Sequence, residues 1–295
     1  MPYSFGNYTV DAVSGLIRFV NNTTKEKKHF GVMKVRGYTD YELKLVREDA
    51  PYEIADPKEK PVFEKALSVV KELTGPDMNE YDIEKALHDW VIYNTKYDYD
   101  TYNEVKITED SNYWTGLFDN HMAVCAGYAG GFNMLLRLAG IECEYVGGTD
   151  ALGGAHAWSA VRINGKWYLV DTTWDDTDDS AANERDTYMY FNTQGNMAGH
   201  HVPQKWVKLC NSLDDNYFYK NSVVVKSLEE LKQALIAKQD NSAIYIRFEG
   251  FEPTSEQLDS DEICHIIPGY YLWAHDFIIN EFSGVKVYQF NKMKM

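Results

Sequence analysis

The sequence predicts an α+β protein, with helices and an antiparallel hairpin at its centre and further strands towards both ends. Apolar residues recur at helical spacing after Cys125, so this cysteine falls in the first turn of an expected helix. Two alternating segments, 155–163 and 166–171, are joined by Asn164-Gly165, a strong signal for a two-residue hairpin turn. A helix followed by such a hairpin is typical of a fold that combines helices with an antiparallel sheet.

Changes in this pattern along the chain divide it into three expected units. Residues 1–50 hold short alternating runs and predict a small β unit. Residues 58–210 begin with two helices, the second capped by Asn79, and contain the cysteine helix and the hairpin. Residues 216–295 show strands and helices in the order βαβαββ, which predicts an accessory α/β domain for packing or recognition.

Cys125 opens a helix that is expected to stop at Gly140. Unpaired backbone N–H groups and the positive end of the helix dipole stabilise a thiolate in a first turn. The same N–H groups can stabilise an oxyanion on an attacked carbonyl. Gly127, Gly130 and Gly131 follow, and each weakens a helix by ~1 kcal/mol relative to alanine. They indicate that a packed strand or a substrate approaches the helix backbone closely.

The hairpin places His156 and Asp171 on one face of the sheet. With a two-residue turn at Asn164-Gly165, paired residue numbers sum to 329, so Trp158 lies opposite Asp171. His156 and Asp171 are then diagonal neighbours, roughly 7–8 Å apart between backbones, a span that side chains can bridge. A register slip of one residue would put them on opposite faces.

Cys125, His156 and Asp171 together offer a nucleophile, a base and an orienting group. The Cys125 thiolate would attack an amide or ester carbonyl, His156 would take and return the proton, and Asp171 would orient the imidazole. A lone cysteine at a helix start is more often a packed core residue, and a lone histidine on a strand is usually structural. The coincidence of all three features favours a catalytic site.

The bulk composition excludes several classes of protein. A chain of 295 residues with 44% hydrophobic residues can fold around a substantial core. Its net charge of −16 argues against binding nucleic acid, and no apolar run is long enough for membrane insertion. We expect no signal peptide, so the protein is cytoplasmic, or secreted with an export segment removed. The oligomeric state is left open.

The segments around the three candidate residues resemble the motifs of the transglutaminase-like superfamily, above all its bacterial branch. These segments are 124–129 (VCAGYA), 154–158 (GAHAW) and 165–176 (GKWYLVDTTWDD). The resemblance covers roughly residues 80–195. It implies a papain-like core, in which the helix bearing the cysteine packs on an antiparallel sheet, and makes 58–210 the catalytic domain. It also implies that Cys125, His156 and Asp171 form a catalytic triad.

The resemblance leaves the reaction open. Members of the superfamily include cross-linking transglutaminases, deamidases, cysteine peptidases, peptide N-glycanases and inactive scaffolds. The active ones share an acyl thioester on the cysteine and differ in what resolves it. We therefore expect a cysteine hydrolase or acyltransferase acting on a protein or peptide amide, with no cofactor. The alternative is a catalytically silent binding or scaffold module with the same fold.

Other residues have weaker patterns. His121 is a rival base, but no orienting carboxylate accompanies it. Weak candidates for a second oxyanion donor are Tyr113, Trp114 and Asn120. The cysteines at 143, 210 and 264 are expected to be buried and inert, and His265 and His275 structural.

Two segments raise the question of a metal. The acidic run 171–179 (DTTWDDTDD) has enough carboxylates for calcium but lacks the glycine and the terminal glutamate of an EF-hand loop. A structural loop is therefore favoured. His200 and His201 could ligate a metal, yet no other ligand cluster accompanies them in the sequence. No metal site is predicted.

Overall fold

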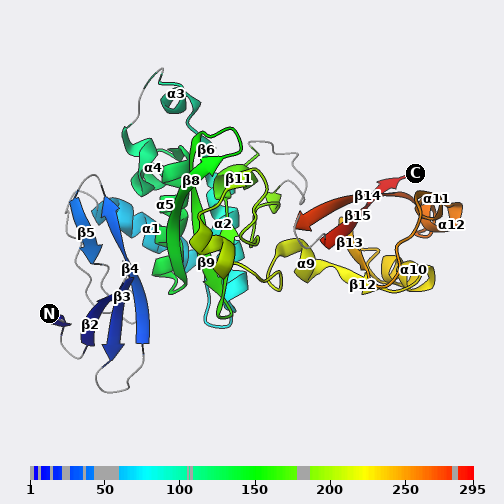
Figure 1. Cartoon of the computed structure of the whole chain (residues 1–295), viewed down its shortest axis with the longest axis horizontal. Helices are drawn as coiled ribbons and strands as arrows, with labels where there is room; N and C mark the ends of the chain where they lie inside the picture. Colours follow the sequence, from blue (N-terminus) through cyan, green and yellow to red (C-terminus); the bar gives the residue numbers. More distant parts are fainter. Residues whose placement is uncertain are drawn as a thin grey trace.

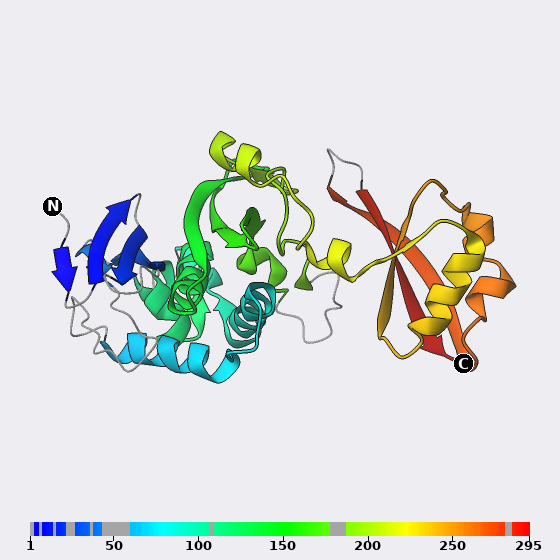
Figure 2. The same ribbon diagram turned by 90° about the horizontal axis from the view of Figure 1, so that it is seen from below.

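The computed structural model has an elongated shape, with a β-sheet at each end and a mixed helical and sheet region between them (Figures 1 and 2). The described residues are 3–5, 8–13, 16–21, 27–35 and 38–42, for which the backbone alone is described, and 60–104, 106, 109–177, 187–280 and 285–295. Within these ranges, no helix combines the length and the apolar character needed to cross a membrane.

The N-terminal strands form an antiparallel sheet in which each strand pairs with the next along the chain. The strands are β1 (Tyr3–Phe5), β2 (Tyr8–Val13), β3 (Leu16–Asn21), β4 (Lys27–Val35) and β5 (Tyr38–Glu42). Sequential antiparallel pairing needs only short connections, which agrees with the alternating runs separated by turn residues in the sequence. The expected β character of this segment is confirmed.

Five helices form among the described residues between 60 and 138. They are α1 (Lys60–Leu73), α2 (Glu80–Asn94), α3 (Tyr99–Tyr102), α4 (Trp114–Asp119) and α5 (Cys125–Leu138), with a 3-10 turn, η1, at Glu109–Asn112. Asn79 caps α2 as predicted, since its side chain accepts the N–H of Asp82 at 3.0 Å. Gly140, with φ of 84°, ends the path of α5 in the left-handed conformation that glycine tolerates.

The central sheet has the order β10-β9-β8-β11, and every pair in it is antiparallel. Its strands are β8 (Glu142–Asp150), β9 (Ala155–Ile163), β10 (Lys166–Val170) and β11 (His200–His201). Helix α5 packs against β8 and β9, and this is the helix-on-sheet arrangement that the motifs implied. Its residues Tyr128, Phe132 and Leu135 are completely buried in the main apolar core.

The hairpin register agrees with the predicted one. Ile163 pairs with Lys166 across a turn in which Asn164 and Gly165 have φ of 51° and 80°. Two consecutive positive φ values are those of a type I′ turn, whose twist matches the strands it joins. One detail differs: β10 ends at Val170, and Asp171 is the N-cap of helix α6 (Thr172–Asp175) instead of the last strand residue.

Helix α5 is approached closely by another segment of the protein, as its glycines indicated. A Cβ on Gly127 would lie 2.5 Å from the Ser111 carbonyl oxygen, and one on Gly131 would lie 2.8 Å from the Leu117 side chain. The segments that approach α5 are therefore η1 and α4, together with Ala123 just before the helix, whose Cβ would lie 2.8 Å from one on Gly127. At Gly130 a Cβ would meet only Trp114, at an ordinary 3.5 Å.

The C-terminal elements follow the predicted βαβαββ order, except that the second expected helix is two short helices. They are β12 (Val223–Val225), α10 (Leu228–Ala237), β13 (Ala243–Phe248), α11 (Ser255–Leu258), α12 (Asp261–Cys264), β14 (Tyr270–Asn280) and β15 (Val285–Lys294). The sheet order is β12-β13-β15-β14, with β12 and β13 parallel. The division of the chain into three domains with the expected boundaries stays a prediction.

The remaining short elements connect these parts. They are β6 (Lys96–Tyr97), which pairs in parallel with β7 (Met122–Ala123), and the helices α8 (Gln204–Leu209) and α9 (Tyr217–Asn221). From α9, the ring of Phe218 contacts Tyr245 of β13 and Phe277 of β14, at centroid distances of 5.3 and 4.8 Å. An aromatic contact thus joins the central region to the C-terminal sheet.

The glycines of α5 give a matched pair of substitutions. Gly130→Ala should raise the free energy of unfolding by up to ~1 kcal/mol, because the new methyl has room and alanine favours the helix. Gly127→Ala should lower it by about 1–3 kcal/mol, because the methyl would meet the backbone of Ser111. Urea unfolding of the two variants measures both effects. A Gly127→Ala protein as stable as the parent would contradict the close packing of η1 on α5.

Candidate active site

Cys125 is the first residue of α5, and it is the one cysteine of the four that is not buried. The parallel pairing of β6 with β7 holds the backbone just before it, since Tyr97 pairs with Ala123. Burial raises the pKa of the Cys143 thiol to about 11 and that of Cys210 to about 12, so both stay protonated at neutral pH. Cys125 therefore combines partial exposure with a helix N-terminus, the surroundings that activate a thiol.

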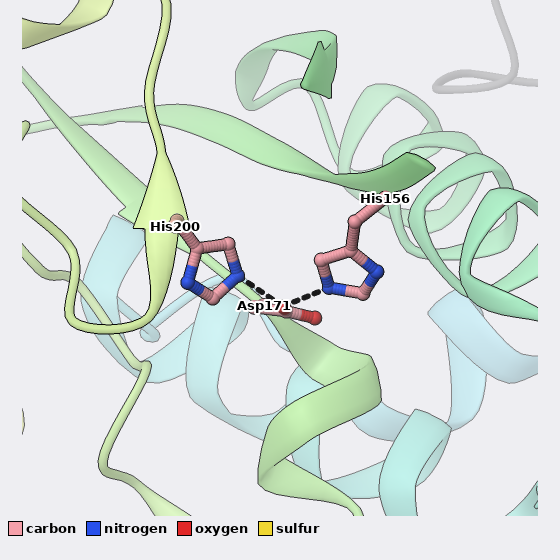
Figure 3. Close-up of side chains that lie close together, drawn as sticks. All are labelled: His156, Asp171 and His200. Carbon is pink, nitrogen blue, oxygen red and sulfur yellow. Dashed lines mark hydrogen bonds and ion pairs between the residues drawn. The ribbon is translucent and has the colours of Figure 1, made fainter. Parts of the chain in front are cut away.

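His156 and Asp171 are in direct contact. The Nε2 atom of His156 lies 2.6 Å from Oδ2 of Asp171, and the side chains are 8% and 0% exposed. Figure 3 shows the Nδ1 atom of His156 on the side of the ring away from Asp171. Because Asp171 occupies Nε2, Nδ1 is the atom left to bond Cys125. The hairpin register set by the Asn164-Gly165 turn thus brings His156 and Asp171 together, as predicted.

The surroundings of His156 favour its protonated form. Burial lowers the pKa of His156, but hydrogen bonds to Asp171 and to Cys125, together with their negative charges, raise it to about 10. A protonated imidazole between a thiol and a carboxylate favours the thiolate by direct electrostatic attraction. The three residues expected to act together lie in one cluster.

The carboxylate of Asp171 receives four N–H groups. Its Oδ1 accepts the backbone N–H groups of Thr173 and Trp174 at 2.9 and 3.2 Å. Its Oδ2 accepts from His156 and, at 2.8 Å, from Nε2 of His200. Burial by itself would raise the pKa of Asp171. The hydrogen bonds and charges of the two histidines lower that pKa by more, so the net shift is downward. Asp171 is an ionised carboxylate.

His200 is the residue of this cluster that the sequence did not connect to the site. Its ring is fully buried, and Figure 3 shows it approaching Asp171 from the side opposite His156. Three aromatic rings lie close to it: Trp174 at 4.2 Å, Trp158 at 4.9 Å and Tyr190 at 5.6 Å between centroids. The only signal in the sequence was the His200-His201 pair itself, which suggested a metal.

The cluster has the composition of a metal site but not the spacing. One donor atom from each of His156, Asp171 and His200 lies within 4.8 Å of the others. Donor atoms around a tetrahedral zinc ion stay about 3.3 Å apart, since each bond is roughly 2.1 Å long. The contacts of 2.6 and 2.8 Å to Oδ2 are shorter than that and have hydrogen-bond length. We assign them as hydrogen bonds.

Two tyrosines flank Cys125. Burial raises the pKa of Tyr97, and the charge that Cys125 can carry raises it further, while the Cys125 backbone forms a hydrogen bond with the phenol. Burial and Cys125 likewise raise the pKa of Tyr145 to about 12. Both phenols stay protonated and can donate hydrogen bonds next to the sulfur. Tyr97 and Tyr145 therefore border the site.

A second charged layer lies beneath the first. His88 of α2 is completely buried, with Nε2 3.0 Å from Asp175 and Nδ1 3.2 Å from Asp89. Burial lowers the pKa of His88, but the hydrogen bonds to the two aspartates raise it to about 9. The backbone of Tyr190 joins the layers, because its N–H donates to Asp175 and its C=O accepts from Asp171. Helix α6 is thus held at both ends.

Over its described residues, the acidic run 171–179 forms a structural loop and a short helix, in agreement with the structural alternative to a calcium loop. Asp171 and Asp175 have the partners given above, and Asp176 accepts the hydroxyl of Tyr128. Asp178 and Asp179 lie outside the described residues. Each described carboxylate of the run is engaged by donors of the protein itself.

The other candidates lie apart from the triad or have other roles. His121 is exposed, and its Nδ1 bonds the carbonyl of Asn94 at 3.0 Å. Trp114 is buried against Phe118 in the packing of α4. His265 lies 3.6 Å from Asp261, and His275 faces Asn291 within the C-terminal sheet. Tyr113 is the N-cap of α4 and Asn120 its C-cap, and an oxyanion role for either stays a prediction.

Comparison with known sequences places the candidate residues inside a described family profile. The profile of the transglutaminase-like superfamily matches residues 67–172, which include Cys125, His156 and Asp171. The kyphoscoliosis peptidase of Mus musculus is 29% identical over 119 residues, covering 36% of this chain and 17% of that protein. Its Homo sapiens counterpart is 32% identical over 103 residues, covering 30% of this chain and 15% of that protein. The matched segment thus spans only about a sixth of each relative.

Among solved structures, one titled as a TGase is 20% identical, with a TM-score of 0.34 over 42% of this chain and 33% of that chain. This likeness is too low to carry an argument by itself. The profile match covers the segment that holds the cysteine helix and the hairpin. Residues 67–172 of this chain therefore match the transglutaminase-like superfamily.

Proposed function

We propose that this protein is a cysteine acyltransferase or hydrolase that forms an acyl thioester on Cys125 from a protein or peptide amide. The observation that carries the proposal is the 2.6 Å contact between His156 and Asp171 next to a thiol at a helix N-terminus. This arrangement supplies a nucleophile, an acid–base group and an orienting carboxylate within one cluster. The superfamily of the core supports the same class of chemistry.

The chemistry takes two steps. The Cys125 thiolate attacks the amide carbonyl, and the developing oxyanion is stabilised by N–H groups at the start of α5. The C–N bond then breaks, and the leaving amine takes the proton held on Nδ1 of His156. In the second step His156 accepts a proton from water or from an acceptor amine, which attacks the thioester and frees the sulfur. Asp171 stabilises the protonated imidazole throughout.

The substrate is proposed to be a protein or peptide, because the cysteine is only partly exposed and tyrosines border it. Tyr99 and Tyr102 of α3 are 61% and 62% exposed, and both pack on Tyr97, which adjoins Cys125. Tyrosines combine a rigid apolar ring with a hydroxyl, and they are enriched where proteins bind other chains. An extended chain lying over Cys125 would contact this surface.

Thiol alkylation tests the activated cysteine directly. At about pH 6, iodoacetamide should modify Cys125 about a hundredfold faster than an ordinary thiol, which is less than 1% ionised there. Cys125→Ala should lose this labelling, because burial keeps Cys143 and Cys210 protonated. His156→Gln should slow it strongly, whereas His121→Gln serves as a matched control and should label like the parent.

Peptide mapping of the modified protein identifies the labelled residue. A parent protein that alkylates at Cys125 no faster than a free cysteine would contradict the proposal. It would favour the catalytically silent scaffold instead.

The products distinguish the reaction types. Incubation with a glutamine-containing peptide, with and without a primary amine, should give an acylated amine, released ammonia or new peptide N-termini. These products indicate a transglutaminase, a deamidase and a peptidase respectively. Turnover should fall as the pH rises through about 10, because His156 then loses the proton that the leaving amine needs. Turnover that persists in Cys125→Ala would contradict the assignment of the nucleophile.

A further inference from the structure

Two imidazoles share one buried carboxylate oxygen, and the proposed two-step chemistry uses only one of them. His156 and His200 approach Oδ2 of Asp171 from opposite sides, at 2.6 and 2.8 Å. Their ring centroids are 5.3 Å apart. Both nitrogens of His200 have hydrogen-bond partners, one of them this carboxylate.

The partners of His200 determine its protonation state. Its Nδ1 lies 2.8 Å from the carbonyl oxygen of Ala198, which carries no hydrogen, so Nδ1 must donate. Its Nε2 lies 2.8 Å from Oδ2 of Asp171. Asp171 already accepts from His156 and from two backbone N–H groups, so it is ionised and Nε2 must donate as well. An imidazole that donates from both nitrogens is a cation.

Aromatic rings surround this imidazole. Those of Trp174, Trp158 and Tyr190 have centroids 4.2, 4.9 and 5.6 Å from its own. Other ionisable groups also face the cluster. Asp150 of β8 pairs with His200 and accepts the N–H groups of Leu152 and Gly154. Asp175 of α6 is bound to His88. Tyr190 and Cys125 are the remaining two groups.

We propose that His200 is a positioning residue of this site, a protonated imidazole that balances Asp171 and so lets Cys125 and His156 ionise as a pair. This proposal rests on the function proposed above. A thiolate, one imidazolium and a carboxylate would leave a net negative charge in a buried cluster, which is costly. The second imidazolium brings the four groups to neutrality. It also holds Asp171 from the side opposite His156, so that the carboxylate cannot turn away.

The test compares His200→Gln with His201→Gln. Glutamine can place its amide N–H group where Nε2 of His200 donates, so the hydrogen bond to Asp171 is kept while the charge is removed. His201 is the neighbour on β11, is exposed, and its ring bonds Thr149, so its variant is the matched control. The readout is the rate of Cys125 alkylation by iodoacetamide as a function of pH, with kcat and KM measured alongside.

His200→Gln should move the midpoint of the pH–alkylation profile up by about one pH unit. This is the shift expected when a unit positive charge on the order of 10 Å away is lost at an effective dielectric constant of about 20. Its kcat should fall about tenfold with KM unchanged, and His201→Gln should match the parent. A His200→Gln profile that coincides with the parent's would overturn the proposal.

The parent profile separates this outcome from failure of the proposed function. A parent midpoint near that of a free cysteine, about pH 8.5, contradicts the proposed function itself. A low parent midpoint that is unchanged in His200→Gln contradicts the role of His200 alone.

A second measurement needs no substitution. Nitrogen-15 spectra of the histidine side chains in the parent protein should show His200 protonated on both nitrogens at about pH 8. A neutral His200 at that pH overturns the proposal, even where His200→Gln does not fold.

Discussion

The carboxylate of Asp171 is the point on which three elements of the structure converge. It caps α6 through two backbone N–H groups, receives His156 from β9, and receives His200 from β11. Because the side chain is completely buried, these four donors replace the hydrogen bonds that water would give it. Removing the carboxylate would leave two imidazoles without their acceptor and α6 without its cap, at a cost of several kcal/mol. The geometry around Cys125 depends on that one group.

Helix α6 carries this organisation into the rest of the protein. It is only four residues long, yet its preceding residue Asp171 faces the site and its last residue Asp175 faces His88 of α2. The backbone of Tyr190 bonds to both aspartates and so fixes the distance between the two layers. The orientation of His156 therefore depends on α6, α2 and Tyr190 as well as on its own strand. Such fixed surroundings are what a preorganised acid–base group requires.

The part of the site that local patterns determine could be predicted from the sequence. The Asn164-Gly165 turn sets the hairpin register, and the register alone brings His156 to Asp171. The helical repeat places Cys125 at an N-terminus. The order of elements in the C-terminal part and the cap at Asn79 follow from equally local signals. These features depend on residues close together in the chain, so short motifs and periodicity are enough to predict them.

What could not be predicted depends on pairings between distant segments. His200 reaches the site because the two-residue strand β11 pairs with Thr149 and Asp150 of β8, some fifty residues earlier, and no periodicity marks so short a strand. Tyr97 adjoins Cys125 through the equally short β6–β7 pairing. The choice of Asp171 to cap α6 instead of extending β10 arises from the competition of its side chain with the strand for backbone N–H groups.

The central proposal is that Asp171, acting through His156, favours the thiolate form of Cys125. The ultraviolet absorbance of the thiolate, taken as the difference between the parent and Cys125→Ala, measures this directly. At about pH 7 the parent should already show the full absorbance of one thiolate, and Asp171→Asn should show it only at higher pH. Thiolate absorbance that appears in the parent only near pH 8.5, as for a free cysteine, would contradict the account.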